Sequence, residues 1–342
     1  MTKTQVAVFF GGPSGEYEIS LASGTAVLQA LQESGFDLYK IAISRKGEFF
    51  LYRGPIRDII TDKWSKDPAR LTPLSPVNGG FCSLTDPTFR LRPDVLFPVL
   101  HGNFGEDGKL QGVFSYIGIP YVGCGTAASA LCMNKALTKD CLQACKIPLL
   151  PYCRVKEQDG EAAGRLLGYP LFLKPISGGS SLGASKVTTA GAFPSAYRAA
   201  AAFGPVMAEP YIKGREIEVA LLETASGLRA SRPGEIHPGA DFYDYNDKYH
   251  SHKAVLSVPA DLPKDIAETA METAKKAFRH LSCRGLARVD FFYTEDGRLL
   301  LNEINTMPGM TAGSLYPRLC RESFDLSMPE LCRELVNTAF LP

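Results

Sequence analysis

Two apolar-rich runs near the C-terminus predict a β-hairpin. Residues 286–293 read LARVDFFY and residues 298–305 read RLLLNEIN. The Asp-Gly pair at 296–297 is a strong signal for a tight turn between them. If that pair forms a two-residue loop, Glu295 lies opposite Arg298, and this count fixes the pairing of every later position.

The same count brings four polar side chains onto one face of the hairpin. Arg288 lies opposite Asn305, and Asp290 lies opposite Glu303. Two facing carboxylates repel each other, and a divalent cation such as Mg²⁺, shared with substrate phosphates, would relieve the repulsion. The alternatives are a solvent-exposed polar face or an Arg–carboxylate pair without a ligand. The turn-rich segment 306–311 (TMPGMT) favours a binding loop, and with it the metal.

Apolar runs followed by glycine-rich loops predict a parallel α/β sheet in the N-terminal part. Residues 4–10 form a buried strand, and the loop GGPSGE leads from it into a helix over 20–35. Residues 94–100 form another buried strand that ends at His101. Ligands bind at such strand ends, which makes Glu16 and His101 candidates. The alternatives are a Glu that complements the helix dipole and a structural His.

Other segments are predicted from pattern alone. Residues 38–44 and 48–53 are strands, whereas 54–90 is rich in Pro, Asp and Ser and is predicted to be an irregular insertion without chemistry. Helical periodicity predicts helices at 126–144, 263–281 and about 325–339.

A small-residue loop between two strands predicts a phosphate site. The segment 169–187 carries Lys174 on an apolar strand and then the loop 177–183 (SGGSSLG). Such a loop can donate backbone N–H groups to phosphates, although it does not fit the Walker pattern. A bound phosphate would also supply the counter-charge for Lys174. The alternative is a flexible surface hairpin, with Lys174 and Lys135 as plain surface lysines.

Two further segments suit a nucleotide site. Residues 206–223 are predicted as strand, linker and strand, with Glu209 at the end of the first strand and Glu216 and Glu218 at the start of the second. Carboxylates at such a crossing could accept from an adenine amine and ribose hydroxyls; surface charges at strand ends are the alternative. Residues 234–260 are aromatic and polar, too long for a simple connection, and are predicted to be a lid.

Composition narrows the function class. A chain of 342 residues predicts two or three domains, and a net charge of +1 argues against nucleic acid or anionic membrane as a partner. No signal peptide or membrane-spanning run is evident. Nine cysteines without CxxC spacing are typical of reduced thiols in a cytoplasmic enzyme. The absence of GxGxxG argues against a Rossmann-type oxidoreductase.

Five motifs in order carry a resemblance to one family. They are HGNFGEDGKLQG (101–112), KPISGGSSLG (174–183), FYDYNDKY (242–249), GLARVDFF (285–292) and LNEINTMPGMT (301–311). Together they resemble the D-alanine–D-alanine ligases of the ATP-grasp superfamily, over nearly the whole length. The resemblance implies an α/β fold, in which a Rossmann-like (pre-ATP-grasp) α/β domain precedes a two-part ATP-grasp α+β domain. The implied bounds are 1–125 for the N-terminal domain, 126–212 for the central subdomain and 213–342 for the C-terminal domain.

The resemblance implies ATP-dependent, ADP-forming ligation of two D-alanines through an acyl phosphate, for peptidoglycan synthesis. ATP would lie between the central and C-terminal parts, on Lys135, Lys174, Glu209, Glu216, Phe172 and Phe292. Two Mg²⁺ ions, or Mn²⁺, would bind Asp290, Glu303 and Asn305. The implied catalytic residues are Glu16, Ser180, Tyr249, Arg288 and Gly309, and the implied substrate-binding residues are His101, Lys248, Ser314 and Leu315. The implied protein is a cytoplasmic homodimer that acts on small molecules.

Rival readings stay open at this point. A D-Ala–D-Ser or D-Ala–D-Lac ligase of vancomycin-resistance type is the nearest, and EYEIS (16–20) resembles the serine type. Lys248-Tyr249 argues against lactate, and Leu315 argues against serine, because the serine type tends to carry Arg there. A degenerate, non-catalytic nucleotide sensor would lack metal ligands, and none is missing.

Overall fold

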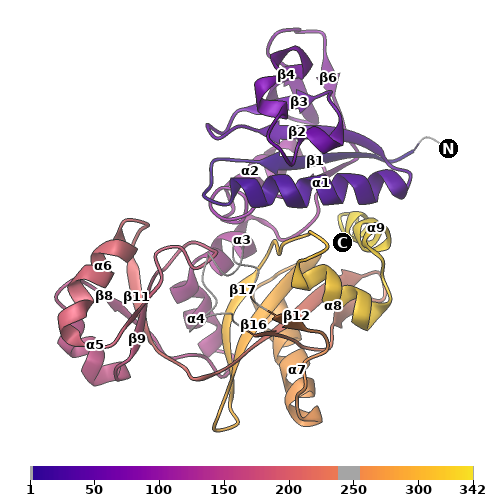
Figure 1. Ribbon diagram of the computed structural model, residues 1–342. Helices are drawn as coiled ribbons and strands as arrows, with labels where there is room; N and C mark the ends of the chain where they lie inside the picture. The colour runs from indigo at the N-terminus through magenta and orange to yellow at the C-terminus, as the bar shows by residue number, and fades with distance from the viewer. Residues whose placement is uncertain (1–2, 238–254, 342) are drawn as a thin grey trace.

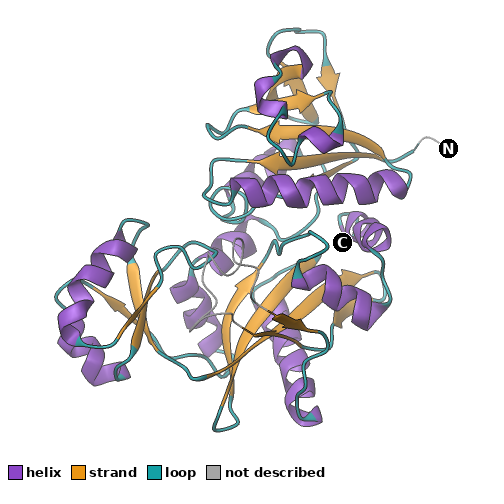
Figure 2. Cartoon of the chain, in the orientation of Figure 1, coloured by secondary structure: helices purple, strands orange, loops and turns teal. Residues whose placement is uncertain are grey.

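The computed structural model describes residues 3–237 and 255–341, which form three sheets in three successive stretches of chain (Figures 1 and 2). The first sheet has seven strands, the second four and the third six. The lid predicted within 234–260 falls largely on 238–254, outside the described residues, and so do Lys248 and Tyr249.

The N-terminal sheet is built around its first strand. β1 (Gln5–Gly11) lies between β2 (Asp37–Ile43) and β7 (Val95–Pro98) and is parallel to both. The chain leaves β1 to one side and returns on the other, so the carboxyl ends of β1 and β7 form a switch point of the kind at which ligands bind. Helix α1 (Tyr17–Glu33) starts there, and α2 (Lys109–Ile117) follows β7.

The expectation of an irregular insertion at 54–90 is wrong. Residues in this stretch add β4 (Leu71–Val77), β5 (Gly80–Ser83) and β6 (Arg90–Leu91) to the sheet beyond β3 (Phe49–Tyr52), all antiparallel. The strands are short and β4 contains prolines, so the local pattern hides them. Trp64 is buried, with its ring edge-on to Phe10 at 5.8 Å between centroids.

Replacing Trp64 with Ala will destabilise the protein by about 3–5 kcal/mol, because the substitution leaves a large cavity in the core. Chemical unfolding of the two proteins measures the difference. Replacing the exposed Leu84 of the same stretch with Ala is the control and will change stability by less than about 0.5 kcal/mol. If Trp64→Ala lowers the free energy of unfolding by less than about 1 kcal/mol, residues 54–90 do not contribute to the core and are a peripheral insertion.

The helical run predicted at 126–144 is two helices. α3 (Thr126–Met133) and α4 (Lys135–Gln143) are separated by Asn134, whose backbone is extended. Its side-chain oxygen accepts from the N–H of Leu137 at 3.0 Å, an N-cap that begins a new helix. This break places Lys135 at the first position of α4, so its side chain can reach the neighbouring sheets.

The central sheet is antiparallel, in the order β10 (Ser185–Val187), β9 (Leu171–Pro175), β11 (Val206–Pro210) and β8 (Cys153–Val155). Helices α5 (Gly160–Leu167) and α6 (Phe193–Ala201) pack on it. The strand–linker–strand prediction for 206–223 is confirmed, because β11 leads through a short linker into β12 (Gly214–Thr224) of the third sheet.

The third sheet runs β15 (Val255–Ser257), β14 (Gly234–His237), β12, β16 (Leu286–Thr294) and β17 (Leu299–Asn305), with β13 (Gly227–Ala230) also on β12. Helices α7 (Lys264–His280), α8 (Leu315–Phe324) and α9 (Met328–Thr338) cover it, and α8 was not predicted. Helix α9 also packs against α1, so the first and third parts share one core (Figure 1).

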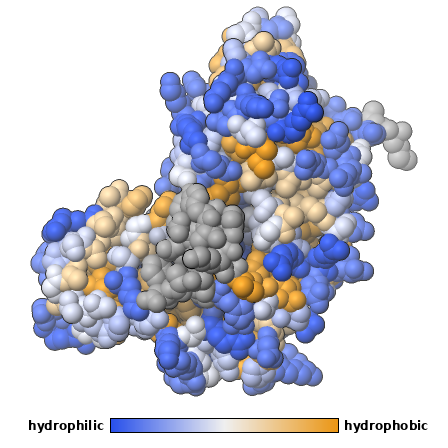
Figure 3. All heavy atoms as spheres, in the orientation of Figure 1, coloured by the Kyte–Doolittle hydropathy of each residue, from blue (hydrophilic) through white to orange (hydrophobic). Residues whose placement is uncertain are grey.

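The outer surface is mainly hydrophilic on the face in Figure 3, where hydrophobic residues form scattered small patches. Among the described residues, no helix combines the length and the apolar character needed to cross a membrane.

Candidate active site

Two adjoining cavities lie between the three sheets. The first cavity is lined by residues of the central sheet, the loop after β9 and one face of the third sheet. The second cavity lies between the N-terminal part and the third sheet. Seven residues line both cavities, which therefore lie against each other: Lys135, Gly178, Gly179, Ser180, Glu218, Arg288 and Glu303.

The β16–β17 hairpin supplies the floor. Its register pairs Asp290 with Glu303 and Arg288 with Asn305, as the sequence predicts. The predicted two-residue loop is wrong, because Thr294 donates its N–H to the carbonyl of Arg298 at 2.9 Å and leaves a three-residue loop.

A bulge between the loop and the site restores the predicted register. Asp290 pairs with Glu303, but the next residue, Phe291, pairs with Leu301, so Asn302 is the extra residue. The two one-residue departures cancel. Asn302 itself lines the first cavity.

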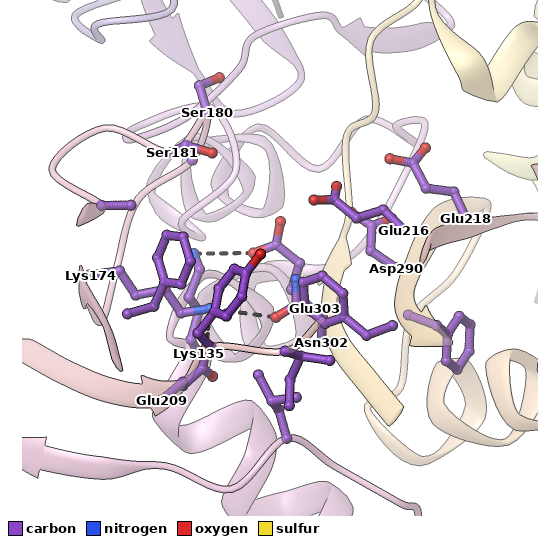
Figure 4. A pocket seen from close by; sticks show the side chains of 18 of the residues that line it. Lys135, Lys174, Ser180, Ser181, Glu209, Glu216, Glu218, Asp290, Asn302 and Glu303 are labelled. Atoms are coloured by element: carbon purple, nitrogen blue, oxygen red, sulfur yellow. Dashed lines mark hydrogen bonds and ion pairs between the residues drawn. The ribbon is translucent and has the colours of Figure 1, made fainter. Parts of the chain in front are cut away.

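Three carboxylates form a row across neighbouring strands. Glu218 on β12 pairs with Asp290 on β16, which pairs with Glu303 on β17, and all three line the first cavity (Figure 4). Glu218 and Asp290 are buried and Glu303 is about one-third exposed. Such a row is unstable unless cations lie beside it.

Two cations from the protein offset that charge. Arg288 binds Asp290 through two hydrogen bonds, of 2.8 and 2.7 Å, and its Nε lies 2.9 Å from Glu218. Burial acts to lower the pKa of Arg288, but the two carboxylates hold it well above its usual value. Lys135 lies 3.3 Å from Glu303 and donates to the carbonyl of Gly178 at 2.6 Å.

A second charged cluster lies at the other end of the first cavity. Glu209 on β11 is bound by Lys174 at 2.6 Å and by Lys139 at 2.9 Å. Burial acts to raise the pKa of Glu209, but the two lysines hold it below its ordinary value. Lys174 also reaches Asn302 at 3.5 Å (Figure 4).

Aromatic rings flank this end of the cavity. Phe172 on β9 and Phe292 on β16 both line it, and Glu216 on β12 pairs with Phe292. Tyr211 stacks on Phe172 with ring centroids 6.1 Å apart. The two phenylalanines and Glu216 that the sequence predicts as an adenosine site are therefore brought to one cavity.

The loop after β9 closes over the second cavity. Ser180 and Ser181 have φ of +52° and +57°, a left-handed conformation that is uncommon outside glycine. This shape aims Ser180 across the gap, where its hydroxyl donates to Glu16, the residue before α1. Gly102 approaches the same carboxylate so closely that a Cβ there would overlap it.

His101 lies in the second cavity with both ring nitrogens in hydrogen bonds. Nδ1 is 3.0 Å from the carbonyl of Met307, and Nε2 is 3.0 Å from the hydroxyl of Ser23. Burial acts to lower its pKa, but Glu106 beside it raises the value overall; burial in turn raises the pKa of Glu106. In this structure, His101 links α1 to the loop after β17.

That loop carries the remaining predicted residues. Gly309, Ser314 and Leu315 all line the second cavity. A Cβ at Gly309 would lie 2.7 Å from the hydroxyl of Ser314, so a larger residue there would displace that hydroxyl. Ser314 in turn bonds the hydroxyl of Thr311 at 2.8 Å.

Comparison with known proteins shows which family the chain belongs to. Residues 5–124 match the family model described as D-ala D-ala ligase N-terminus, and residues 141–337 match D-ala D-ala ligase C-terminus. The chain belongs to the D-alanine–D-alanine ligase family. It is therefore an ATP-grasp ligase that uses ATP and small-molecule substrates in a ligation for peptidoglycan synthesis.

Relatives of two kinds are similar to the ligase. A D-alanine--D-alanine ligase of Acetivibrio thermocellus is 40% identical, with 98% of this chain and 96% of the relative covered. The vancomycin C-type resistance protein VanC2 of Enterococcus casseliflavus is also 40% identical, with 98% of each covered. Among solved structures, the VanG D-Ala:D-Ser ligase from Enterococcus faecalis has a TM-score of 0.88 at 35% identity, with 99% of this chain and 100% of that one covered. The structure of the D-alanine-D-alanine ligase from Coxiella burnetii has a TM-score of 0.87 at 32% identity, with 99% of this chain and 94% of that chain covered.

Sequence reasoning missed several residues in or directly behind the cavity walls of the ligase. Lys139, Asn302, Tyr211 and Glu106 are not singled out by the sequence, and Glu218 is considered there only as a possible acceptor for a nucleoside. Lys139 was detectable, because it follows Lys135 by four residues and so lies one turn further along the same helix. The others depend on contacts between distant segments.

Proposed function

We propose that the ligase joins two D-alanine molecules into D-alanyl-D-alanine, converting ATP to ADP and phosphate through a D-alanyl phosphate intermediate. The observation that carries the proposal is the pair of adjoining cavities, which share seven lining residues. The Glu218–Asp290–Glu303 row lies at the junction between a lysine-lined end and an end closed by Glu16.

ATP occupies the first cavity in this proposal. Its adenine lies between Phe172 and Phe292, its 6-amino group donates to Glu209, and its ribose donates to Glu216. Lys135 and Lys174 bind the phosphates, and the loop at 177–183 covers them with backbone N–H groups. All these groups line that cavity or its loop.

The predicted metal ligands fit Mg²⁺ by their chemistry. Asp290 and Glu303 are register partners that line the first cavity, Arg288 binds both oxygens of Asp290, and Asn305 follows Glu303 on β17 and lines the second cavity. The protein cations beside the carboxylates mark an excess of negative charge there. Among residues 3–237 and 255–341, no group of three or more His, Cys, Asp or Glu side chains could hold a metal ion. The predicted ligands, Asp290, Glu303 and Asn305, include only two residues of these four types and so do not form such a group. Two Mg²⁺ ions, or Mn²⁺, would screen the charge of the phosphates.

The first D-alanine binds in the second cavity by its ammonium to Glu16, which Ser180 orients and which Tyr249 joins. Its carboxylate oxygen attacks the γ-phosphorus, and ADP leaves. The amine of the second D-alanine, after losing a proton, attacks the acyl carbon, and phosphate leaves. Arg288 and the N–H of Gly309 stabilise the negative oxygen that develops in this step.

The second D-alanine binds beside α8. Ser314, together with Lys248 or its neighbours, holds its carboxylate, and Leu315 presents an apolar wall to its methyl group. His101, which also lines this cavity, lies near the first D-alanine. A D-Ala–D-Ser or D-Ala–D-Lac ligase is the second candidate, and the similarity to VanC2 and to the VanG D-Ala:D-Ser ligase favours the serine form of it.

The expected acceptor order at neutral pH is D-Ala, then D-Ser, then D-lactate. A serine hydroxyl against Leu315 lacks a partner, which costs roughly 1–3 kcal/mol and gives about tenfold preference or more for D-Ala. Leu315→Arg will reduce the preference for D-Ala over D-Ser as the acceptor. Phosphate release with each acceptor, and competition between them, measures this order. Faster formation of D-Ala-D-Ser at equal concentrations would establish the resistance-type alternative instead.

We propose further that the domains span 1–125, 126–212 and 213–342, since the three sheets fall within these ranges. The cytoplasm suits the protein, because ATP is available there and the cysteines are free thiols. The homodimer expected from the family resemblance is tested by sedimentation equilibrium.

A further inference from the structure

Glu209 is held by two lysines where one would neutralise it. Lys174 binds Oε2 at 2.6 Å, and Lys139 binds Oε1 at 2.9 Å. Both oxygens of one buried carboxylate are therefore occupied by cations, and the cluster carries an excess positive charge. Burying an additional ammonium group is costly, so the second lysine calls for a reason.

The two lysines differ in what they can reach. Lys174 lines the first cavity, retains some exposure and lies near Asn302, so its ammonium can move toward a ligand (Figure 4). Lys139 is fully buried behind the wall and is not among the lining residues. Its Nζ also donates to the carbonyl of Leu150 at 3.1 Å, which fixes it in place.

We propose that Lys139 is a positioning residue that keeps Glu209 ionised and oriented when Lys174 transfers from Glu209 to the nucleotide phosphates. This inference rests on the proposed ATP site and adds a residue to it. Lys139 touches neither substrate nor metal, and it acts through Glu209.

The electrostatics require such a residue if Lys174 is to move. Removing Lys174 from a buried carboxylate without another cation leaves an uncompensated charge. Glu209 would then either retain Lys174 or take up a proton. If Glu209 retains Lys174, this lysine cannot bind the phosphates. If Glu209 is protonated, its carboxyl group can accept fewer hydrogen bonds from the adenine amine. Burial lowers the pKa of Lys139 and Glu209 offsets part of this, as expected for a cation maintained by its partner.

The first test replaces Lys139 with Met, which keeps the length and removes the charge. The dissociation constant of a non-hydrolysable ATP analogue, measured by calorimetry, will rise about 10- to 100-fold, and the preference for the ATP analogue over the GTP analogue will fall. Lys139→Arg will retain much of the affinity because it keeps the charge. Lys276→Met is the matched control, since Lys276 donates to a backbone carbonyl on the surface at 2.7 Å. Affinity in Lys139→Met equal to wild type would overturn the proposal.

The second test separates positioning from simple structural support. In Glu209→Gln the neutral amide no longer traps Lys174, so adding Lys139→Met to it will weaken nucleotide binding by less than about threefold. A loss as large as that in the single Lys139→Met variant would overturn the proposal. If wild-type protein itself fails to bind the ATP analogue, the proposed function fails instead.

Discussion

Turnover will fall at least about a thousandfold when Asp290 is replaced by Asn or Glu303 by Gln, with the fold intact. These residues face each other across the hairpin, and each supplies an anionic oxygen to the cavity. Either amide removes one negative charge and one strong metal ligand while nearly preserving shape. The loss should appear in kcat, because charge screening is needed most when phosphate meets carboxylate. Phosphate-release kinetics across a Mg²⁺ titration measures it.

The same hairpin offers a matched control. Asp296 is an exposed carboxylate in the turn, where it binds Arg298 at 2.8 Å. Asp296→Asn makes the same chemical change away from the cavities and will leave turnover within about twofold. Thermal unfolding of all three variants verifies their folding. Near-normal turnover in Asp290→Asn or Glu303→Gln would refute the metal assignment.

Replacing Arg288 with Met will lower kcat about 100- to 1,000-fold, the effect of removing one donor to a developing oxyanion. Arg288 lines both cavities, and Asp290 and Glu218 fix its guanidinium. Arg288→Lys will restore only part of the rate, because a lysine cannot form the planar, bidentate pair that Arg288 makes with Asp290. Single-turnover measurements separate the chemical step from substrate binding.

Loss of Arg288 also removes a cation that lies between two buried carboxylates, Asp290 and Glu218, so stability must be measured alongside rate. Arg298→Met, at the exposed turn, is the control for removing an arginine from the same hairpin. If Arg288→Met lowers stability but leaves the rate of the folded fraction unchanged, Arg288 supports the fold and does not assist the reaction.

The residue pairing in the β16–β17 hairpin could be predicted from the sequence. Alternation of side chains and an Asp-Gly pair predicted that Asp290 faces Glu303, and the structure has this pairing. The prediction used a loop that is one residue too short. It succeeded because the bulge at Asn302 compensates, and a pattern of period two contains no sign of either departure.

The stretch 54–90 shows the opposite case. Its short, proline-containing strands have little local preference for an extended state, so the sequence pattern predicted none. They form because an existing sheet edge and a core around Trp64 are available to them. The break at Asn134 is similar, since one capping hydrogen bond divides a periodic run that predicts a single helix.

By itself the sequence determined the elements whose signals are local and the motifs that identify the family. Strand ends with glycine-rich loops, the lysine before the small-residue loop and the hairpin carboxylates are features of this kind. Only the tertiary structure decided how charges are shared between elements. That Lys139 and Lys174 meet on Glu209, and that Glu218 completes the carboxylate row, depends on strands and helices far apart in the chain. Pairing energies among buried charges act through space, and sequence spacing does not encode those distances.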